Sequence, residues 1–64
     1  MDLQQAADEA MEYLDSVGVA ADYDIRYMYL EVFTENNLFN FAYDDDFKAF
    51  MLKISETYPQ KSPA

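Results

Sequence analysis

The sequence predicts an all-α fold, a compact three-helix domain with helices over residues 2–17, 24–36 and 45–58. Apolar residues recur at helical spacing in each segment. Residues that start and stop helices flank the first and last segments. No repeat, low-complexity segment or linker is present, and one glycine and two prolines leave little room for a second unit. We therefore expect one acidic helical domain over residues 1–58 and a polar tail over residues 59–64.

The first helix is predicted from one narrow apolar stripe and an acidic face opposite it. Spacings of four, three, four and three separate the stripe residues Leu3, Ala7, Ala10, Leu14 and Val17. The opposite face carries Asp8, Glu9, Glu12 and Asp15. Asp2 stands at an N-cap position, and Gly18 stands where a C-terminal cap belongs.

The middle of the chain admits two predictions. Residues Ile25, Met28, Tyr29, Val32 and Phe33 fit the i, i+3, i+4, i+7, i+8 pattern of a helix. The same region is rich in strand-forming residues, and ENNL followed by LFNFAY would suit a hairpin. The alternative fold is therefore α-β-β-α, with a hairpin over residues 25–43. We prefer the helix because the polar residues Arg26, Glu31 and Thr34 do not keep one strand parity.

The last helix combines an acidic start, an apolar face and a proline stop. Its apolar face comprises Phe47, Phe50, Met51, Ile54 and Tyr58, and Pro59 ends it. Asp44, Asp45 and Asp46 precede the helix, where carboxylates cap free N–H groups and complement the helix dipole. A calcium loop is not expected, because its glycine and its twelfth-position glutamate are missing and the aspartates are consecutive.

Charge and composition narrow the function. Thirteen acidic residues face four basic ones, for a net charge of −9. Residues 1–46 hold twelve acids and one base, a charge of −11, whereas residues 47–64 hold one acid and three bases, a charge of +2. Such a chain repels nucleic acids and anionic membranes and attracts basic proteins. The simpler interpretation is that the acidic residues only keep the protein soluble, but the density of negative charge is higher than solubility requires.

Catalysis and cofactor binding fit the sequence poorly. The chain has no cysteine and no histidine, so the commonest metal ligands and the usual base for a serine nucleophile are missing. The single glycine excludes a glycine-rich phosphate loop. We expect a non-enzymatic protein without catalytic residues, cofactor or metal. No targeting segment or apolar span is visible, so a cytoplasmic location is expected.

The acidic residues form the predicted partner-binding site. On the first helix, Asp8, Glu12 and Asp15 rise about 10 Å along the axis, which matches roughly three phosphate steps of DNA. Negative charges continue along the chain with few intervening basic residues, whereas a solvated helix face usually carries charges of both signs. The remaining predicted site residues are Asp22, Asp24, Glu31, Glu35, Asp44, Asp45, Asp46, Tyr23 and Tyr27.

In size, charge and helical content over its whole length, the chain resembles small acidic phage and mobile-element proteins that mimic nucleic acids, including anti-CRISPR inhibitors. The resemblance implies an inhibitor that docks on the basic groove of a Cas-type or restriction complex and blocks DNA binding. Carboxylates would replace phosphates there, and Tyr23, Tyr27 or Tyr43 would add apolar contact.

Aromatic residues suggest a second function. On a helix over residues 24–36, Tyr23, Tyr27 and Leu30 share a face that is either core or interface. If it is an interface, the protein is a regulatory adaptor or antitoxin-like subunit, and a homodimer could use the same surface. Salt separates the two functions, because mimicry weakens as salt rises and aromatic docking does not.

Overall fold

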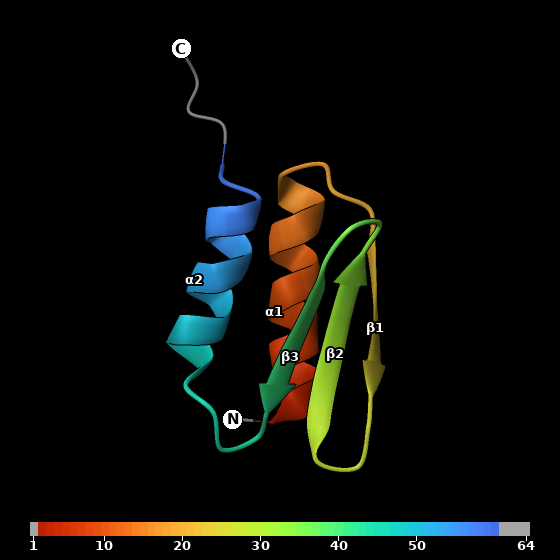
Figure 1. Ribbon diagram of the computed structural model, residues 1–64, viewed down its shortest axis with the longest axis vertical. Coiled ribbons are helices and arrows are strands. Elements are labelled where there is room, and N and C mark those ends of the chain that lie inside the picture. Colours follow the sequence, from red (N-terminus) through yellow and green to blue (C-terminus); the bar gives the residue numbers. More distant parts are fainter. Residues whose placement is uncertain (1, 61–64) are drawn as a thin grey trace.

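The chain folds as two helices on one face of a three-stranded antiparallel sheet (Figure 1). The computed structural model describes residues 2–60. The elements in chain order are α1 (Leu3–Ser16), β1 (Ala21–Ile25), β2 (Tyr29–Thr34), β3 (Leu38–Ala42) and α2 (Phe47–Thr57). The strands form a meander with β2 in the centre. Helix α1 packs on β1 and β2, and α2 packs on β3. Within residues 2–60, no helix is both long and apolar enough to span a membrane.

The all-α prediction is therefore wrong, because residues 24–36 form strands and a turn instead of a helix. The parity argument failed because the polar residues belong to different segments. Arg26 follows β1, whose even-numbered residues face outward, whereas on β2 the odd-numbered Glu31 faces outward and Thr34 faces inward. A two-residue turn, Tyr27 and Met28, resets the parity between the strands.

The α-β-β-α alternative comes nearer but is also incomplete. Its hairpin over residues 25–43 contains β2 and β3, and the turn falls in the predicted ENNL segment. It lacks β1, whose short ADYDI sequence carries two aspartates, residues that are depleted in strands. Pairing with β2 outweighs this low propensity, because it places Tyr23 beside Val32.

Both ends of α1 are capped as predicted. The Asp2 carboxylate accepts a hydrogen bond from the Gln4 N–H at 3.2 Å. At the other end, Gly18 has a φ of 76°, in the left-handed region that glycine adopts without a Cβ penalty. The Gly18 N–H donates to Asp15 O at 3.0 Å and the Val19 N–H to Leu14 O at 2.9 Å, the two bonds of a Schellman motif. The chain therefore leaves α1 in a defined direction and enters β1.

Helix α2 also begins at its predicted cap. Asp46 accepts a hydrogen bond from the Lys48 N–H at 3.0 Å, and the helix ends one residue before Tyr58, which Pro59 follows. Phe50 and Ile54 are buried, and the other residues of the predicted apolar face are partly buried against the core: Phe47, Met51 and Tyr58. Of the predicted polar tail, residues 61–64 lie outside the described residues.

The core lies between the helices and the inner face of the sheet. Small side chains of α1 let that helix approach the strands closely, and Ala6, Ala7 and Ala10 are fully buried. Opposite them, Leu30 pairs with Phe41 across β2 and β3. The Phe41 ring centroid is 5.0 Å from that of Phe50 and 5.7 Å from that of Phe47. This aromatic cluster attaches α2 to β3.

Tyr58 ties the end of α2 to both other parts of the fold. Its hydroxyl is 2.7 Å from Thr34 Oγ1 and accepts a hydrogen bond from Asn37 Nδ2 at 2.8 Å, at the turn between β2 and β3. Its backbone carbonyl accepts a hydrogen bond from the Tyr13 hydroxyl at 2.7 Å. One residue thus links α1, α2 and the sheet.

Aspartates also occupy the two outer edges of the sheet. Hydrogen-bonded pairs alternate along antiparallel strands, so Tyr23 in β1 and Ala42 in β3 direct their N–H groups away from β2. The Tyr23 N–H donates to Asp22 Oδ1 at 2.8 Å, and the Ala42 N–H donates to Asp45 Oδ2 at 2.8 Å. Each edge therefore has an outward N–H group bonded within its own chain.

Candidate protein-interaction surface

Part of the predicted acidic site lies on α1 and on the edge strand β1, which pack against each other. We call this the acidic flank; it comprises Asp8, Glu12, Asp15, Asp22 and Asp24, all of which are exposed. Gln4 joins its two elements, because its side-chain amide donates to Asp8 Oδ1 at 3.0 Å and to the Tyr23 hydroxyl at 3.1 Å. The flank is therefore built from the outer face of α1 and the edge strand β1.

The α1 part of this flank follows from the amphipathic pattern. The buried side of α1 is formed by alanines and Leu14, so the carboxylates must face solvent. Asp8 and Asp15 lie seven residues apart on the side of α1 nearest β1, and their rise is roughly 10 Å. On β1, Asp22 and Asp24 alternate with the inward-facing Tyr23, so they lie on the outer face of the sheet, away from α1. The acidic flank therefore extends around the β1 edge and does not form one flat face.

Basic partners for these carboxylates are scarce. Arg26 Nε donates to Glu31 Oε1 at 3.0 Å, and Arg26 Nη2 lies 3.8 Å from Asp24 Oδ2. The hydrogen bond to Glu31, then the charges of Glu31 and Asp24, raise the pKa of Arg26 above its usual range. Among residues 2–60, this guanidinium makes the only ion pairs, so most of the thirteen acids have no salt bridge there. The negative charge of the flank is therefore largely uncompensated.

The other predicted acids lie elsewhere. Glu31 is half-buried on the outer face of β2, where it pairs with Arg26. Glu35 is exposed in the turn between β2 and β3, at the opposite end of the sheet from the β1–β2 turn. Asp44, Asp45 and Asp46 lie in the loop between β3 and α2, where Asp45 and Asp46 also bond backbone N–H groups. The twelve predicted site residues therefore do not form one continuous face.

The two predicted tyrosines have different environments. Tyr23 is partly buried, packs against the core and accepts the hydrogen bond from Gln4. Leu30, which was expected beside them on a helix, is fully buried in the sheet. Tyr27 lies in the β1–β2 turn and is 95% exposed. The aromatic helix face on which the adaptor hypothesis depended does not exist, and only Tyr27 of this pair is freely available to a partner.

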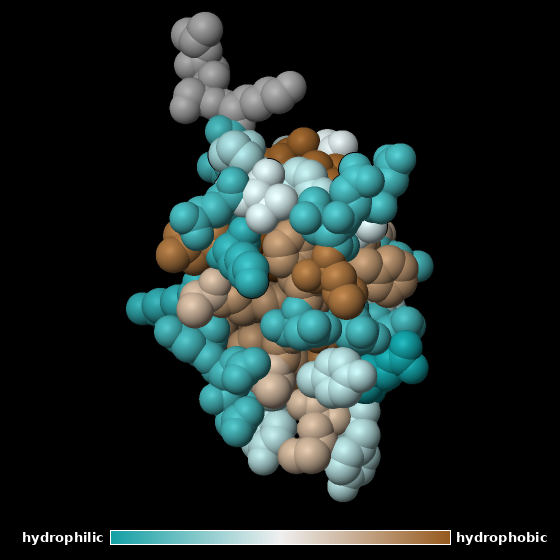
Figure 2. Space-filling view, viewed as in Figure 1, coloured by the Kyte–Doolittle hydropathy of each residue, from teal (hydrophilic) through white to brown (hydrophobic). Residues whose placement is uncertain are grey.

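Sequence reasoning missed the outer face of the sheet. Neither helix covers it, and Figure 2 shows hydrophobic atoms reaching the surface in its middle, among hydrophilic side chains. Leu38, adjacent to Phe33 across β2 and β3, is 55% exposed, and Tyr29 is 41% exposed. Burial alternates along the first residues of YLEVFT, as in a strand with one solvated face, but Tyr29 and Phe33 are apolar residues on that face and hide the alternation in the sequence.

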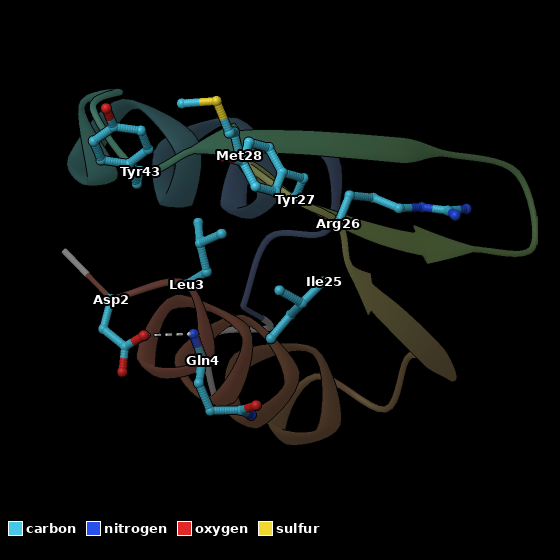
Figure 3. A pocket seen from close by; sticks show the side chains of 8 residues that line it. All are labelled: Asp2, Leu3, Gln4, Ile25, Arg26, Tyr27, Met28 and Tyr43. Carbon is cyan, nitrogen blue, oxygen red and sulfur yellow. Dashed lines mark hydrogen bonds between the residues drawn. The ribbon is translucent and has the colours of Figure 1, made fainter.

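An open hollow of about 680 Å³ lies at the end of the molecule where α1 begins and β1 turns into β2 (Figure 3). Its lining residues are Asp2, Leu3, Gln4, Ile25, Arg26, Tyr27, Met28 and Tyr43. We call this region the tyrosine end. Of the residues that line it, Tyr27 was among the predicted site residues and Tyr43 was expected as a further apolar contact; Met28 and Ile25 were expected on the apolar face of a helix.

Groups of metal-ligating side chains are not found among residues 2–60, where no three of the carboxylates are arranged to hold an ion. Comparison with known proteins finds no family model that matches the chain, and no curated protein or solved structure with significant similarity to it. The surfaces of the molecule are therefore the guide to its function.

Proposed function

We propose that this protein is a non-enzymatic inhibitor that docks its acidic flank on the basic nucleic-acid-binding surface of a protein complex, such as a Cas-type complex, and thereby blocks DNA binding. It would act in the cytoplasm of the cell that contains that complex. The proposal rests on one observation: the flank carries five exposed carboxylates, and of these five only Asp24 has a basic partner among residues 2–60.

Physical chemistry supports this use of the flank. Exposed carboxylates of one sign raise the association rate with a basic surface and fix the orientation of docking. A groove that holds DNA is lined by lysine and arginine that contact phosphates. Carboxylates on a folded helix and strand can replace those phosphates at a fixed spacing, with less ordering cost than a flexible acidic tail.

Competition with DNA tests the proposal. Partners are captured from a bacterial lysate at low salt, purified, and bound to a fluorescent DNA duplex whose anisotropy is followed as the chain is added. We expect the DNA to be displaced, with an inhibition constant that weakens about tenfold between 50 and 200 mM salt, because the contacts are electrostatic. A ternary complex, in which the DNA stays bound, would refute the mimicry.

Charge-neutralised variants locate the docking surface. Asp8→Asn, Glu12→Gln and Asp15→Asn together are expected to weaken inhibition about tenfold. The matched control removes the same number of exposed charges outside the flank, through Glu35→Gln, Asp44→Asn and Glu56→Gln. Equal loss in both triple variants would show that net charge alone, and not the flank, drives the effect.

A second candidate, a regulatory adaptor that binds through apolar contacts, gains support from the exposed aromatic side chains at the tyrosine end. Inhibition or binding that survives high salt and is lost in Tyr27→Ala would favour it. In that outcome the acidic flank would serve only solubility.

A further inference from the structure

The tyrosine end exposes apolar side chains that the fold does not require. Tyr27 and Met28 form the two-residue β1–β2 turn, a position where asparagine and glycine are usual. Their side chains are 95% and 47% exposed, and Tyr43 in the loop after β3 is 52% exposed. These three residues contribute little to the core, so their presence points to contact with a partner.

The hollow has an apolar interior. In Figure 3, Leu3 and Ile25 lie across it from Met28, Tyr27 and Tyr43, while Arg26 extends away. The two tyrosines supply ring surfaces on one side, and the aliphatic groups supply the other. Such an arrangement suits a long side chain with an apolar stem and a planar polar head.

The charge around the hollow is negative. Asp2 lines it, and Asp44, Asp45 and Asp46 follow directly after Tyr43. The N-termini of α1 and α2 lie at the same end (Figure 1) and offset only about half a charge each. Arg26, the one base in the lining, is already paired with Glu31 and Asp24. Asp2, Asp45 and Asp46 each accept a backbone N–H hydrogen bond but have no basic side-chain partner among residues 2–60, so a cationic group entering the hollow would still meet negative charge.

We propose that the tyrosine end receives an arginine side chain from a basic segment of the protein partner. The guanidinium stacks on the ring of Tyr27 or Tyr43 and bonds the Asp2 carboxylate, and its methylene stem covers Leu3 and Met28. Arginine fits better than lysine, because its planar, weakly hydrated head stacks on aromatic rings and forms paired hydrogen bonds with carboxylates. This inference rests on the proposed function and identifies a second point of contact with the same basic partner.

A peptide titration tests this site without the unidentified partner. The probe is a short blocked peptide of alternating arginine and glycine, added to the isotope-labelled chain at 150 mM salt while backbone amide NMR shifts are recorded. We expect the largest shifts at residues 2–4, 25–28 and 43, and binding at least threefold weaker for the matched lysine peptide. Equal binding of both peptides would refute an arginine site.

Variants separate the hollow from the rest of the surface. Tyr27→Ser with Tyr43→Ser is expected to weaken arginine-peptide binding at least threefold, whereas the control Tyr29→Ser, which changes a tyrosine on the outer sheet face, leaves it unchanged. Amide spectra of the free variants verify that each is folded.

Failure here is distinct from failure of the proposed function. Shifts confined to the acidic flank, or no shifts at all, would overturn the arginine site. The inhibitor proposal would remain a separate question, tested by the DNA competition experiment. Shifts at the tyrosine end that grow with protein concentration before peptide is added would also overturn it, because a second copy would then be the occupant.

Discussion

Removing the Tyr58 hydroxyl should destabilise the protein measurably, because it ends two hydrogen bonds that hold α2 to the sheet. The oxygen is 2.7 Å from Thr34 Oγ1 and 2.8 Å from Asn37 Nδ2. A neutral hydrogen bond contributes about 0.5–1.5 kcal/mol net, so Tyr58→Phe can cost at most about 3 kcal/mol. The site is only partly buried, and Thr34 Oγ1 keeps the hydrogen bond from the Asn37 N–H at 3.2 Å. We therefore expect a loss of about 1–2 kcal/mol in the free energy of unfolding.

Urea denaturation followed by circular dichroism measures this loss. With a slope of about 1 kcal/mol per molar urea for a chain this small, the midpoint should fall by about 1–2 M. The ring remains, so the edge contact with Phe39, at a centroid distance of 6.5 Å, is retained. Tyr27→Phe is the control, because it removes the same atom from an exposed side chain.

An unchanged midpoint for Tyr58→Phe, or an equal fall for Tyr27→Phe, would refute the reasoning. A double-mutant cycle with Thr34→Val adds a stricter test. The two changes share one hydrogen bond, so their costs should fall short of additivity by about 0.5 kcal/mol or more. Full additivity would mean that Thr34 and Tyr58 do not interact.

Further predictions concern the turn, the core and the charges. Gly18→Ala should cost about 1 kcal/mol of stability, because the φ of 76° strains any residue with a Cβ, even though a Cβ there would meet nothing within 4 Å. Thermal melting should show the loss, and an unchanged melting temperature would contradict the cap assignment. Phe41→Leu should cost about 1–2 kcal/mol by the same urea assay, and a cost near zero would mean that the Phe41 cluster is loosely packed. Neutralising the acidic flank should leave the midpoint unchanged or raise it at low salt, and a fall would indicate hidden structural contacts. The raised pKa of Arg26 means that its positive charge, and any stability it contributes, is present throughout the neutral range and is lost only in strong base, so its Nε–H NMR signal should keep its position from pH 7 to 10 if exchange is slowed by cooling; a signal that moved over this range would contradict it.

The helix boundaries could be predicted because their causes are local. An N-cap needs one carboxylate that accepts a hydrogen bond from the backbone N–H two residues further along the chain, as at Asp2 and Asp46. A Schellman motif needs a residue that tolerates positive φ, and Gly18 is the only glycine. These requirements involve only a few consecutive residues, so the helix ends can be predicted without the rest of the fold.

The sheet could not be predicted in the same way because its cause is not local. In DIRYMYLEVF the apolar residues satisfy a helical spacing and two strands joined by a turn equally well. The choice is made by partners on the neighbouring strands: Val32 lies between Tyr23 and Phe39, and Leu30 lies between Ile25 and Phe41. A single-segment pattern contains no information on these pairs.

Only part of the candidate site could be predicted, because only part of it depends on local sequence. Exposure of Asp8, Glu12 and Asp15 follows from the amphipathic pattern of α1 alone, and it is confirmed. The position of Tyr27 depends on the β1–β2 turn, which a helix over residues 24–36 does not contain. Its neighbours at the tyrosine end, Leu3 and Tyr43, come from two other segments that only the folded sheet brings together.

The bonded sheet edges constrain how this protein can recognise anything. Partners that add a strand to a sheet need a row of vacant N–H and C=O groups, and such rows also allow chains to stack into fibrils. Here Asp22 and Asp45 each occupy one outward N–H group and place a negative charge beside the edge. A partner's backbone, or a neighbouring copy, would have to displace those carboxylates before it could extend the ladder. Recognition through side chains is therefore easier than strand addition. The same carboxylates oppose edge-to-edge pairing between copies of the chain, which favours a dispersed protein at high concentration.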